Sequence, residues 1–254
     1  MHITSQEIRT ALITGSTSGI GLGIARTLAD TGCRIILNGF GEAQQRQDLL
    51  AEMERRSGQA AQFWEADLSQ ALPALPEVDI LVNNAGIQHT APVEEFSPEM
   101  WEKVLKINLS AAFYTIHGCL PGMRARGWGR IINLASVHGL VASVHKAAYV
   151  AAKHGLLGLT KVVALETARS GITCNAICPG WVLTPLVQQQ IEARAVAQAI
   201  PVEQAQQELL QEKQPSGRFT QVEELGALVV FLCGPGAANL SGTSLPVDGA
   251  WTAQ

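Results

Sequence analysis

Residues 10–21 read TALITGSTSGIG, an apolar run followed at once by three glycines and the start of an apolar helical pattern. Gly15 allows a tight turn, Gly19 lets the backbone approach a pyrophosphate, and Gly21 allows a helix to pack closely on a strand. The N-terminus of the following helix offers free N–H groups and the positive end of its dipole to phosphates. A glycine cluster alone is weak support, but between a strand and a helix it indicates a dinucleotide-binding turn.

Short runs typical of strands alternate with longer helical patterns along the chain. The expected strands are Thr10–Thr14, Arg34–Asn38, Ala61–Ala66, Ile80–Asn83, Arg130–Ala135, Thr173–Cys178 and Ser244–Val247. The expected helices include Ile20–Thr31, Ala43–Ser57, Pro98–Arg126, Ala147–Ser170 and Val222–Leu232. The pattern predicts a single α/β domain over residues 1–254, with a Rossmann-type, doubly wound parallel sheet of about seven strands and helices on both faces.

Two segments depart from this alternation. Residues 67–79, DLSQALPALPEVD, contain two prolines and leave little room for a crossover helix. Residues 185–219 are long, polar and helical in pattern, and they follow a strand end. A helical lid is expected at such a place.

The composition excludes several classes of protein. The chain has 254 residues, 47% of them hydrophobic and 16% charged, so it is neither disordered nor a disulfide scaffold. No stretch reaches the ~18 apolar residues of a membrane span. The net charge of −4 argues against binding to nucleic acid or an anionic membrane. The N-terminal residues do not show a basic segment followed by a long apolar core and a cleavage site, so we do not expect secretion. The five cysteines lack Cys-x-x-Cys spacing, so we expect reduced thiols, no metal site and a cytoplasmic protein.

The glycine turn has the spacing G-x-x-x-G-x-G rather than the usual G-x-G-x-x-G. With further motifs in the same order, the chain resembles the short-chain dehydrogenase/reductase family along essentially its whole length; these motifs are Asn83-Asn84-Ala85-Gly86, Ser136, Tyr149-x-x-x-Lys153, Pro179-Gly180 and Val247-Asp248-Gly249. The sequence departs from the family in the short 67–79 segment and at Leu183, where related enzymes often carry a basic residue.

The resemblance implies that a nicotinamide dinucleotide binds to a defined set of residues. These are Gly15, Thr17, Ser18, Gly19, Ile20, Gly21, Phe40, Asp67, Leu68, Asn83, Ala85, Gly86, Tyr149, Lys153, Pro179, Gly180, Val182 and Thr184. After the second strand, NAD enzymes often carry an acid and NADP enzymes a basic residue. Residues 38–41, NGFG, contain neither, and residues 16–18, STS, contain no Arg. A 2′-phosphate would lack a cationic partner there, so we expect NAD.

Tyr149 and Lys153 lie four residues apart in a helical pattern, so they share one face of the helix. A free phenol titrates near ~10, and a neighbouring ammonium together with a positive nicotinamide ring is expected to lower the pKa of Tyr149. The resemblance implies that Lys153 also binds the nicotinamide ribose, that Ser136 holds the substrate oxygen, and that Asn108 supports a water chain to Lys153. Such a Tyr/Lys pair is often only a surface contact, but here it follows Ser136 in the register of the family.

Several less usual residues point to the substrate. They lie in segments that converge beyond the C-terminal ends of the strands, and they are Gln88, His138, Lys146, Trp181 and Trp251. Taken singly, each has a structural explanation, such as an exposed charge or a core filler. Together they suit a short carboxylate, because cations hold the anion and two indoles exclude water. The resemblance adds Gln190 and implies reversible, NAD-dependent oxidation of (R)-3-hydroxybutyrate to acetoacetate, with Tyr149 as general base.

Two other functions stay open. A reductase of the same family that acts on a 3-oxoacyl thioester or a sugar would not need Lys146 near a carboxylate. A cofactor-binding sensor without turnover is the second alternative, although the intact set of Ser136, Tyr149 and Lys153 disfavours it.

The expected helix that carries Tyr149 is apolar nearly all round, so it must be buried on several sides. A subunit interface would bury it, and the resemblance implies a homotetramer built as a dimer of dimers.

Overall fold

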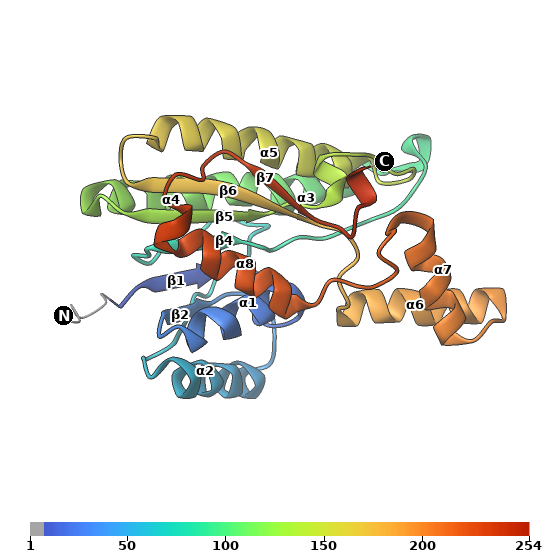
Figure 1. Ribbon diagram of the computed structural model, residues 1–254, viewed down its shortest axis with the longest axis horizontal. Helices are drawn as coiled ribbons and strands as arrows, with labels where there is room; N and C mark the ends of the chain where they lie inside the picture. The colour runs from blue at the N-terminus through green and yellow to red at the C-terminus, as the bar shows by residue number, and fades with distance from the viewer. Residues whose placement is uncertain (1–7, 254) are drawn as a thin grey trace.

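A computed structural model describes residues 8–253 of the chain. Seven parallel strands form one sheet in the order β3-β2-β1-β4-β5-β6-β7 (Figure 1). They are β1 (Thr10–Ile13), β2 (Arg34–Leu37), β3 (Gln62–Phe63), β4 (Ile80–Asn83), β5 (Gly129–Leu134), β6 (Ile172–Pro179) and β7 (Ser244–Val247). The strand order reverses between β1 and β4, which confirms the expected doubly wound sheet.

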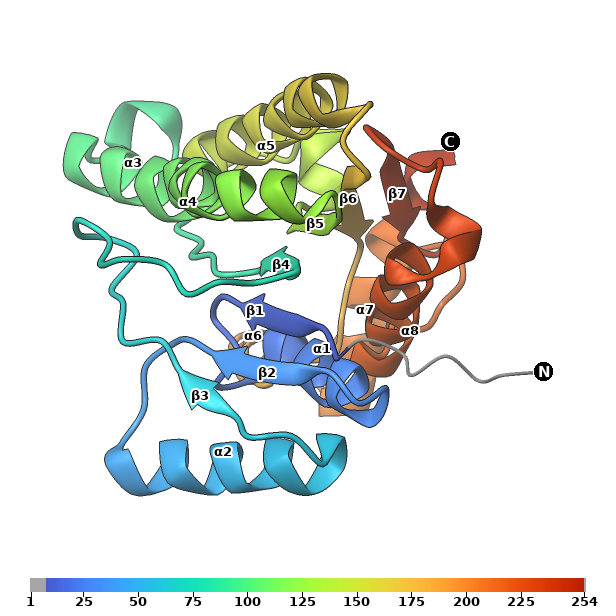
Figure 2. The same cartoon turned by 90° about the vertical axis from the view of Figure 1, so that its left-hand side faces the viewer.

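Helices cover both faces of this sheet, as Figure 2 shows from the side. One face carries α1 (Gly19–Asp30), α2 (Ala43–Ser57) and α8 (Val222–Cys233). The other face carries α3 (Pro98–Leu105), α4 (Ala111–Arg126) and α5 (Ala147–Thr167). Because both faces are covered, the inner strands are apolar on both sides rather than alternating.

Two apolar clusters fill these layers. On the first face, Ile24 of α1 and Leu225 of α8 are fully buried against the sheet. On the second face, Ile116 and Met123 of α4 pack with Val163 of α5. Burial of aliphatic side chains on both faces fixes the sheet, and with it the positions of the loops at its carboxyl edge.

The third strand is much shorter than the expected Ala61–Ala66, because only Gln62 and Phe63 pair with β2. Trp64 is buried on the α4 side of the sheet, and its indole N–H donates to the carbonyl of Ala74 at 3.2 Å. The chain therefore leaves the sheet at this residue. Residues 67–79 form no helix, as expected, and Leu75 packs against α4 in its place.

The expected helix Pro98–Arg126 is not continuous. A π-helical turn, Lys106–Ser110, separates α3 from α4. Wide turns of this kind often occur at functional sites, because they redirect one side chain without ending the helix. Here the turn contains Asn108, whose side chain is buried.

Residues 185–219 form the expected helical pair, α6 (Pro185–Gln198) and α7 (Val202–Lys213), which projects from the rest of the molecule (Figure 1). The pair has a small core of its own, which includes Ile191 and Leu210. At its base, Val182 and Thr220 form a β-bridge. The pair is thus joined to the sheet through a narrow neck.

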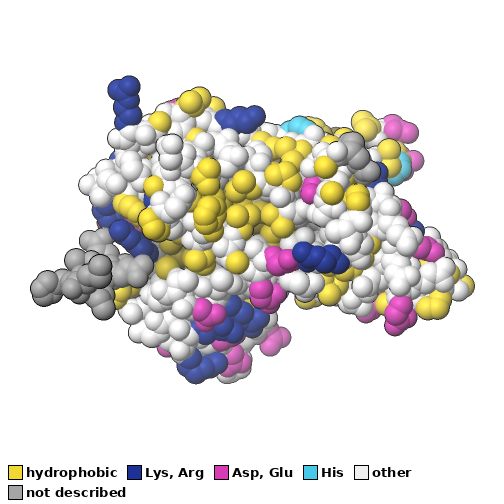
Figure 3. Space-filling view, in the orientation of Figure 1, with side chains coloured by type: hydrophobic (Ala, Val, Ile, Leu, Met, Phe, Trp, Pro, Cys, Tyr) yellow, Lys and Arg dark blue, Asp and Glu magenta, His cyan; other side chains and the backbone are white. Residues whose placement is uncertain are grey.

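The surface has apolar regions over α8 and β7, where yellow side chains gather in Figure 3. Phe231 of α8 is half exposed there. Within residues 8–253, the longest apolar helices fall short of what a membrane crossing requires.

Candidate active site

The loops at the carboxyl edge of the sheet enclose a cleft of about 790 Å³. Parallel strands all end at this edge, so segments distant in sequence meet there. Most of the expected cofactor contacts line the cleft: Gly15, Thr17, Ser18, Gly19, Ile20, Phe40, Asp67, Leu68, Ala85, Gly86, Tyr149, Lys153, Pro179 and Thr184.

Asn83 does not lie on the wall of the cleft as expected. Its Nδ2 donates to Asn133 Oδ1 at 2.9 Å, and its Oδ1 accepts from Thr115 Oγ1 at 2.6 Å. These bonds tie β4 to β5 and α4 beneath the cleft. The side chain is committed to the interior because a buried amide needs partners for both its donor and its acceptor.

Three further expected contacts also lie off the large cleft. Gly21 faces the carbonyl of Gly15, where a Cβ atom would clash. Its role is close packing of helix against turn, as the glycine pattern predicted. Gly180 and Val182 line a smaller neighbouring cavity instead.

The glycine turn fits a dinucleotide phosphate. Gly15 has a φ of +61°, and a Cβ atom there would lie 2.9 Å from Cα of Ala85. Nδ2 of Asn84 donates to the carbonyls of Thr14 and Gly15, both at 2.9 Å, which fixes the turn against the end of β4. The Ser18 side chain makes no capping hydrogen bond to α1, so the N–H groups of the first turn keep their capacity to bind an anion.

Asn38 occupies the position after β2 where an acid or a base would select the cofactor. Its side chain turns inward: Nδ2 donates to the carbonyls of Trp64 and Ala66 at 3.1 and 2.9 Å, and Oδ1 accepts from the N–H of Gly15 at 3.3 Å. A carboxylate could not donate to these two carbonyls. Sequence reasoning noted only that Asn38 is neutral, because nothing in the pattern shows that a polar residue after a strand points inward.

Lys153 lies one helical turn beyond Tyr149 on α5, and the two side chains meet. Nζ of Lys153 is 5.5 Å from the Tyr149 ring centroid and donates to the carbonyl of Leu134 at 2.7 Å. The lysine is only 4% exposed. Burial lowers its pKa to about 8, because an ammonium loses hydration in the interior.

The phenol of Tyr149 differs from the sequence-based expectation. Burial raises its pKa, and a hydrogen bond with Ser136 acts in the opposite direction. The lowering expected from Lys153 is therefore not found in the protein alone. Desolvation is the larger of the two contributions, and the positive nicotinamide ring that formed part of the expectation is not part of the chain.

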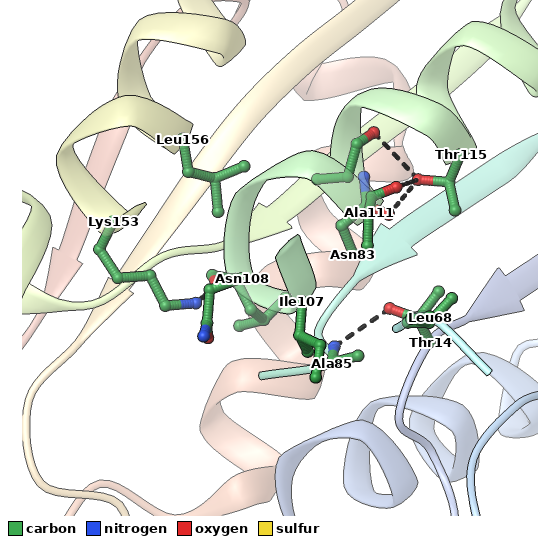
Figure 4. A pocket seen from close by; sticks show the side chains of 12 residues that line it. Thr14, Leu68, Asn83, Ala85, Ile107, Asn108, Ala111, Thr115, Lys153 and Leu156 are labelled. Atoms are coloured by element: carbon green, nitrogen blue, oxygen red, sulfur yellow. Dashed lines mark hydrogen bonds between the residues drawn. The ribbon is translucent and has the colours of Figure 1, made fainter. Parts of the chain in front are cut away.

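Asn108 and Lys153 line a cavity of about 10 Å³, close to the size of one water molecule (Figure 4). Nδ2 of Asn108 donates to the carbonyls of Ile87 and Val104, both at 2.9 Å. Its Oδ1 is buried and has no hydrogen-bond partner among the described residues. A Cβ atom on Gly86 would come within 2.5 Å of this oxygen, so the glycine is required for the asparagine to fit.

A second cavity of about 190 Å³ adjoins the cleft beside Tyr149. The structure brings all six expected substrate residues to its wall: Gln88, His138, Lys146, Trp181, Gln190 and Trp251. Ring centroids of Trp181 and Trp251 are 6.2 Å apart. The indole N–H of Trp181 is buried and has no partner within residues 8–253.

Lys146 gives this cavity a positive charge. Its Nζ is 5.7 Å from the Trp181 ring centroid, and burial lowers its pKa. No Asp or Glu of the described chain lines the cavity, and none lies within ion-pair distance of Lys146. A half-buried cation without a counter-ion attracts an anion of matching size.

His138 is 5% exposed and bridges two serines. Its Nδ1 is 3.3 Å from Ser136 Oγ, and its Nε2 is 2.9 Å from Ser143 Oγ. Burial, reinforced by the charge of Lys146, lowers its pKa to about 4, so the ring is neutral at pH 7. The sequence singled out His138 but not Ser143, because no motif connects a serine five residues away.

These features define a class of protein. The sequence model of the family described as short chain dehydrogenase matches residues 9–195. The chain belongs to this family, and it is an oxidoreductase with a site for a nicotinamide cofactor.

Two similar proteins carry the same name. A D-beta-hydroxybutyrate dehydrogenase of Cupriavidus necator is 55% identical over 256 residues, covering 97% of this chain and 98% of the relative. One of Rhizobium meliloti is 49% identical, covering 97% and 99%.

Solved structures of reductases share the fold. A variant of actinorhodin polyketide ketoreductase with NADPH superposes with a TM-score of 0.87 at 38% identity, covering 98% of this chain and 99% of the other. L-Sorbose reductase from Gluconobacter frateurii, complexed with NADPH and L-sorbose, gives 0.91 at 29% identity and 97% coverage of both chains.

The buried ammonium yields a prediction about stability. Below pH 8, Lys153 is protonated in both the folded and the unfolded chain, so the folded protein bears the full cost of its burial. We expect Lys153→Met to raise the free energy of unfolding by about 1–2 kcal/mol at pH 7. The gain should shrink between pH 8 and the usual lysine pKa, because the folded lysine is already neutral there.

Urea denaturation at pH 7 and pH 9.5 measures this gain. Lys161→Met, on the exposed side of the same helix, serves as the control and should show no such pH dependence. A Lys153→Met protein that is less stable at pH 7, or whose advantage grows with pH, contradicts the assignment.

Proposed function

We propose that this protein oxidises (R)-3-hydroxybutyrate to acetoacetate reversibly with NAD. The observation that carries the proposal is a small cavity with a cation, two indoles and no lining carboxylate among the described residues, placed beside Ser136 and Tyr149. The shared name of the two relatives reported above supports the same substrate.

Proton transfer is assigned to the phenol of Tyr149. Its hydroxyl oxygen takes the proton of the substrate alcohol as the carbonyl forms, and Ser136 Oγ holds the reacting oxygen by a hydrogen bond. A bound nicotinamide supplies the hydride acceptor. Lys153 stabilises the phenolate, and Asn108 offers its unpartnered Oδ1 to a water that connects the lysine with solvent.

The substrate carboxylate is assigned to the cationic cavity. Lys146 supplies the opposite charge, while the amides of Gln88 and Gln190 can donate hydrogen bonds from opposite segments of the wall. Trp181 and Trp251 exclude water, which strengthens the ion pair.

NAD rather than NADP is supported by the end of β2. Asn38 is directed inward, and residues 38–41 carry no cation. Arg46 is the first basic residue after this loop, and its Nη1 donates to both carboxylate oxygens of Glu65 at 2.6 and 2.8 Å. Lys103 lines the cleft as well. Hydrogen bonds from Ser69 lower the pKa of Asp67, and the charge of Lys103 adds a smaller contribution in the same direction. The structures with NADPH are those of other proteins, and they leave this choice to experiment.

The helical pair α6 and α7 is assigned as a lid. Gln190 and Val187 of α6 already line the substrate cavity. The narrow neck at Val182 and Thr220 allows the pair to close as a unit, because its own core holds the two helices together.

We further propose that the protein is a homotetramer and that it works in the cytoplasm. Exposed apolar side chains lie on α4 and α5, among them Phe113, Tyr114 and Leu165, and a second region lies over α8 and β7 (Figure 3). Two such regions suit a dimer of dimers. The five cysteines are free, as in a reducing compartment.

Substitution of Lys146 separates the proposed substrate from the alternatives. We expect Lys146→Met to lower kcat/KM for (R)-3-hydroxybutyrate by about 100-fold, because the carboxylate loses its charge partner. For the neutral methyl ester the loss should stay within about threefold. Tyr149→Phe is the matched control and should lower kcat for both by a factor of about 10²–10⁴.

If Lys146→Met lowers kcat/KM equally for the acid and for the methyl ester, Lys146 does not hold the substrate carboxylate. A wild-type preference for an acetoacetyl thioester or a sugar would favour the reductase alternative. Absence of turnover with every hydroxy acid, thioester and sugar would favour the sensor.

A cation placed after β2 should change the cofactor preference. Phe40 is 76% exposed at the rim of the cleft. Phe40→Arg offers a partner to a 2′-phosphate, so we expect kcat/KM with NADP to rise at least about tenfold relative to NAD. Steady-state rates with both cofactors measure this ratio. Lys103→Ala is the control, because Lys103 is a cation that already lines the cleft. A wild-type preference for NADP that disappears in Lys103→Ala would refute the assignment of NAD.

A further inference from the structure

The chain that returns from the lid to the sheet holds Trp181 by its backbone. The N–H of Trp181 donates to Oε1 of Gln214 at 2.8 Å, and its carbonyl accepts from the N–H of Thr220 at 2.9 Å. Both partners lie beyond the end of α7, in residues 214–220, which we call the return segment. The backbone of Trp181 therefore takes its position from the return segment.

The side chain of Gln214 can bind in one orientation only. It is 1% exposed, and its Nε2 donates to the carbonyl of Arg218. A backbone N–H can only donate and a carbonyl can only accept, so the amide oxygen must face Trp181 and the amide nitrogen must face Arg218. A buried amide that satisfies both groups at once fixes the distance between two segments of the chain.

Gln214 lies where three segments of the chain meet. A Cβ atom on Gly180, in the loop after β6, would come within 2.6 Å of Oε1 of Gln214. The C-terminal segment is tied to the return segment as well, since the N–H of Ser216 donates to the carbonyl of Gly249 at 3.0 Å. The return segment thus connects the lid both to the loop that carries Trp181 and to the segment that carries Trp251.

The position of Trp181 matters for the substrate cavity. Its indole forms part of the wall, with its ring centroid 6.2 Å from that of Trp251 and 5.7 Å from Nζ of Lys146. If the indole moved away, water would reach the ammonium of Lys146, and water weakens an ion pair with a bound carboxylate. Gln214 itself is not among the described residues that line the cavity, so it acts there only through Trp181.

We propose that Gln214 is a positioning residue for the substrate site: it accepts the hydrogen bond of the Trp181 N–H, holds the indole in the cavity wall, and so sets the affinity for a short carboxylate. This inference rests on the proposed function, because it takes the cavity as the place of the substrate carboxylate. Since Gln214 directly follows α7, the same hydrogen bond links the end of the lid to the wall of the cavity.

Substitution of Gln214 by an apolar residue of similar length tests this role in kinetics. Gln214→Met leaves the Trp181 N–H with only a weak acceptor. We expect KM for (R)-3-hydroxybutyrate to rise about tenfold while kcat stays within about threefold, because a displaced wall weakens binding in the ground state and in the transition state alike. Gln211→Met, at an exposed position of α7, is the matched control and should leave both constants unchanged.

Gln214→Glu gives a pH-dependent form of the same test, and it replaces Gln214→Met if that variant does not fold. A protonated carboxyl group can accept from Trp181 and donate to Arg218 as the amide does, whereas a carboxylate cannot donate. Burial raises the pKa of a carboxyl group. The KM of Gln214→Glu should therefore equal that of the wild type near pH 5.5 and exceed it about tenfold at pH 8.5. Neighbouring charged groups, such as Asp248, are common to both proteins, so their ratio isolates the new carboxyl group.

Fluorine nuclear magnetic resonance follows the indole itself, without substrate or turnover. The NAD-bound enzyme is labelled with 5-fluorotryptophan, and the Trp181 signal is assigned with Trp181→Phe. In Gln214→Met this signal should shift or broaden, whereas the signal of Trp128, which precedes β5 at the opposite edge of the sheet, should not change. This readout is unaffected if the substrate proves to be a different compound, so failure of the proposed function and failure of this inference are distinguishable.

Three results would overturn the inference. One is a Gln214→Met variant with the KM of the wild type. Another is a variant whose kcat falls at unchanged KM, which would connect Gln214 with the catalytic geometry around Tyr149 rather than with the wall of the cavity. The third is a Trp181 fluorine signal that stays the same in Gln214→Met, which would show that other contacts hold the indole.

Discussion

A single buried ammonium connects the parts of this site. Nζ of Lys153 donates to the carbonyl of Leu134 at the end of β5, lies against the Tyr149 ring, and lines the small cavity that contains Asn108 Oδ1. The interior disfavours this charge, as the lowered pKa of the lysine shows. The buried ammonium of Lys153 therefore lowers the stability of the protein at the position where a phenol and a cofactor both need a cation. Such a loss of stability is common at active sites.

The substrate cavity also contains polar groups whose burial is not compensated by a partner. Lys146 has no carboxylate partner in the described chain, and the indole N–H of Trp181 and Oδ1 of Asn108 have no hydrogen-bond partner there. Buried polar groups without partners are rare in folded proteins. Two of the three such atoms in the described chain, Oδ1 of Asn108 and Nε1 of Trp181, belong to residues that line the water-sized cavity and the substrate cavity, whereas the third, Nε of Arg130, lies away from them.

Sequence periodicity predicted the doubly wound sheet because its inner strands are nearly continuous apolar runs, and the glycine turn and the Tyr149/Lys153 spacing located the cleft. Periodicity did not predict the features of the fold that tertiary contacts determine. Trp64 leaves the sheet to reach the carbonyl of Ala74, which shortens β3. The π-helical turn at Asn108 is built from the same residue types as the helices on either side. The sequence pattern therefore predicted one continuous helix there. The inward amide of Asn38 and the Ser143–His138 bond join segments whose spacing carries no signal.

Hydride transfer from the assigned carbon can be followed with an isotope. The enzyme is incubated with NAD and (R)-3-hydroxybutyrate that carries deuterium at C3. We expect NADH that is one mass unit heavier and acetoacetate that carries no deuterium at C3. The (S)-enantiomer should give no labelled NADH. Reduced cofactor without the label, or equal transfer from both enantiomers, would contradict a site in which Tyr149, Ser136 and the cationic cavity together orient one face of one alcohol.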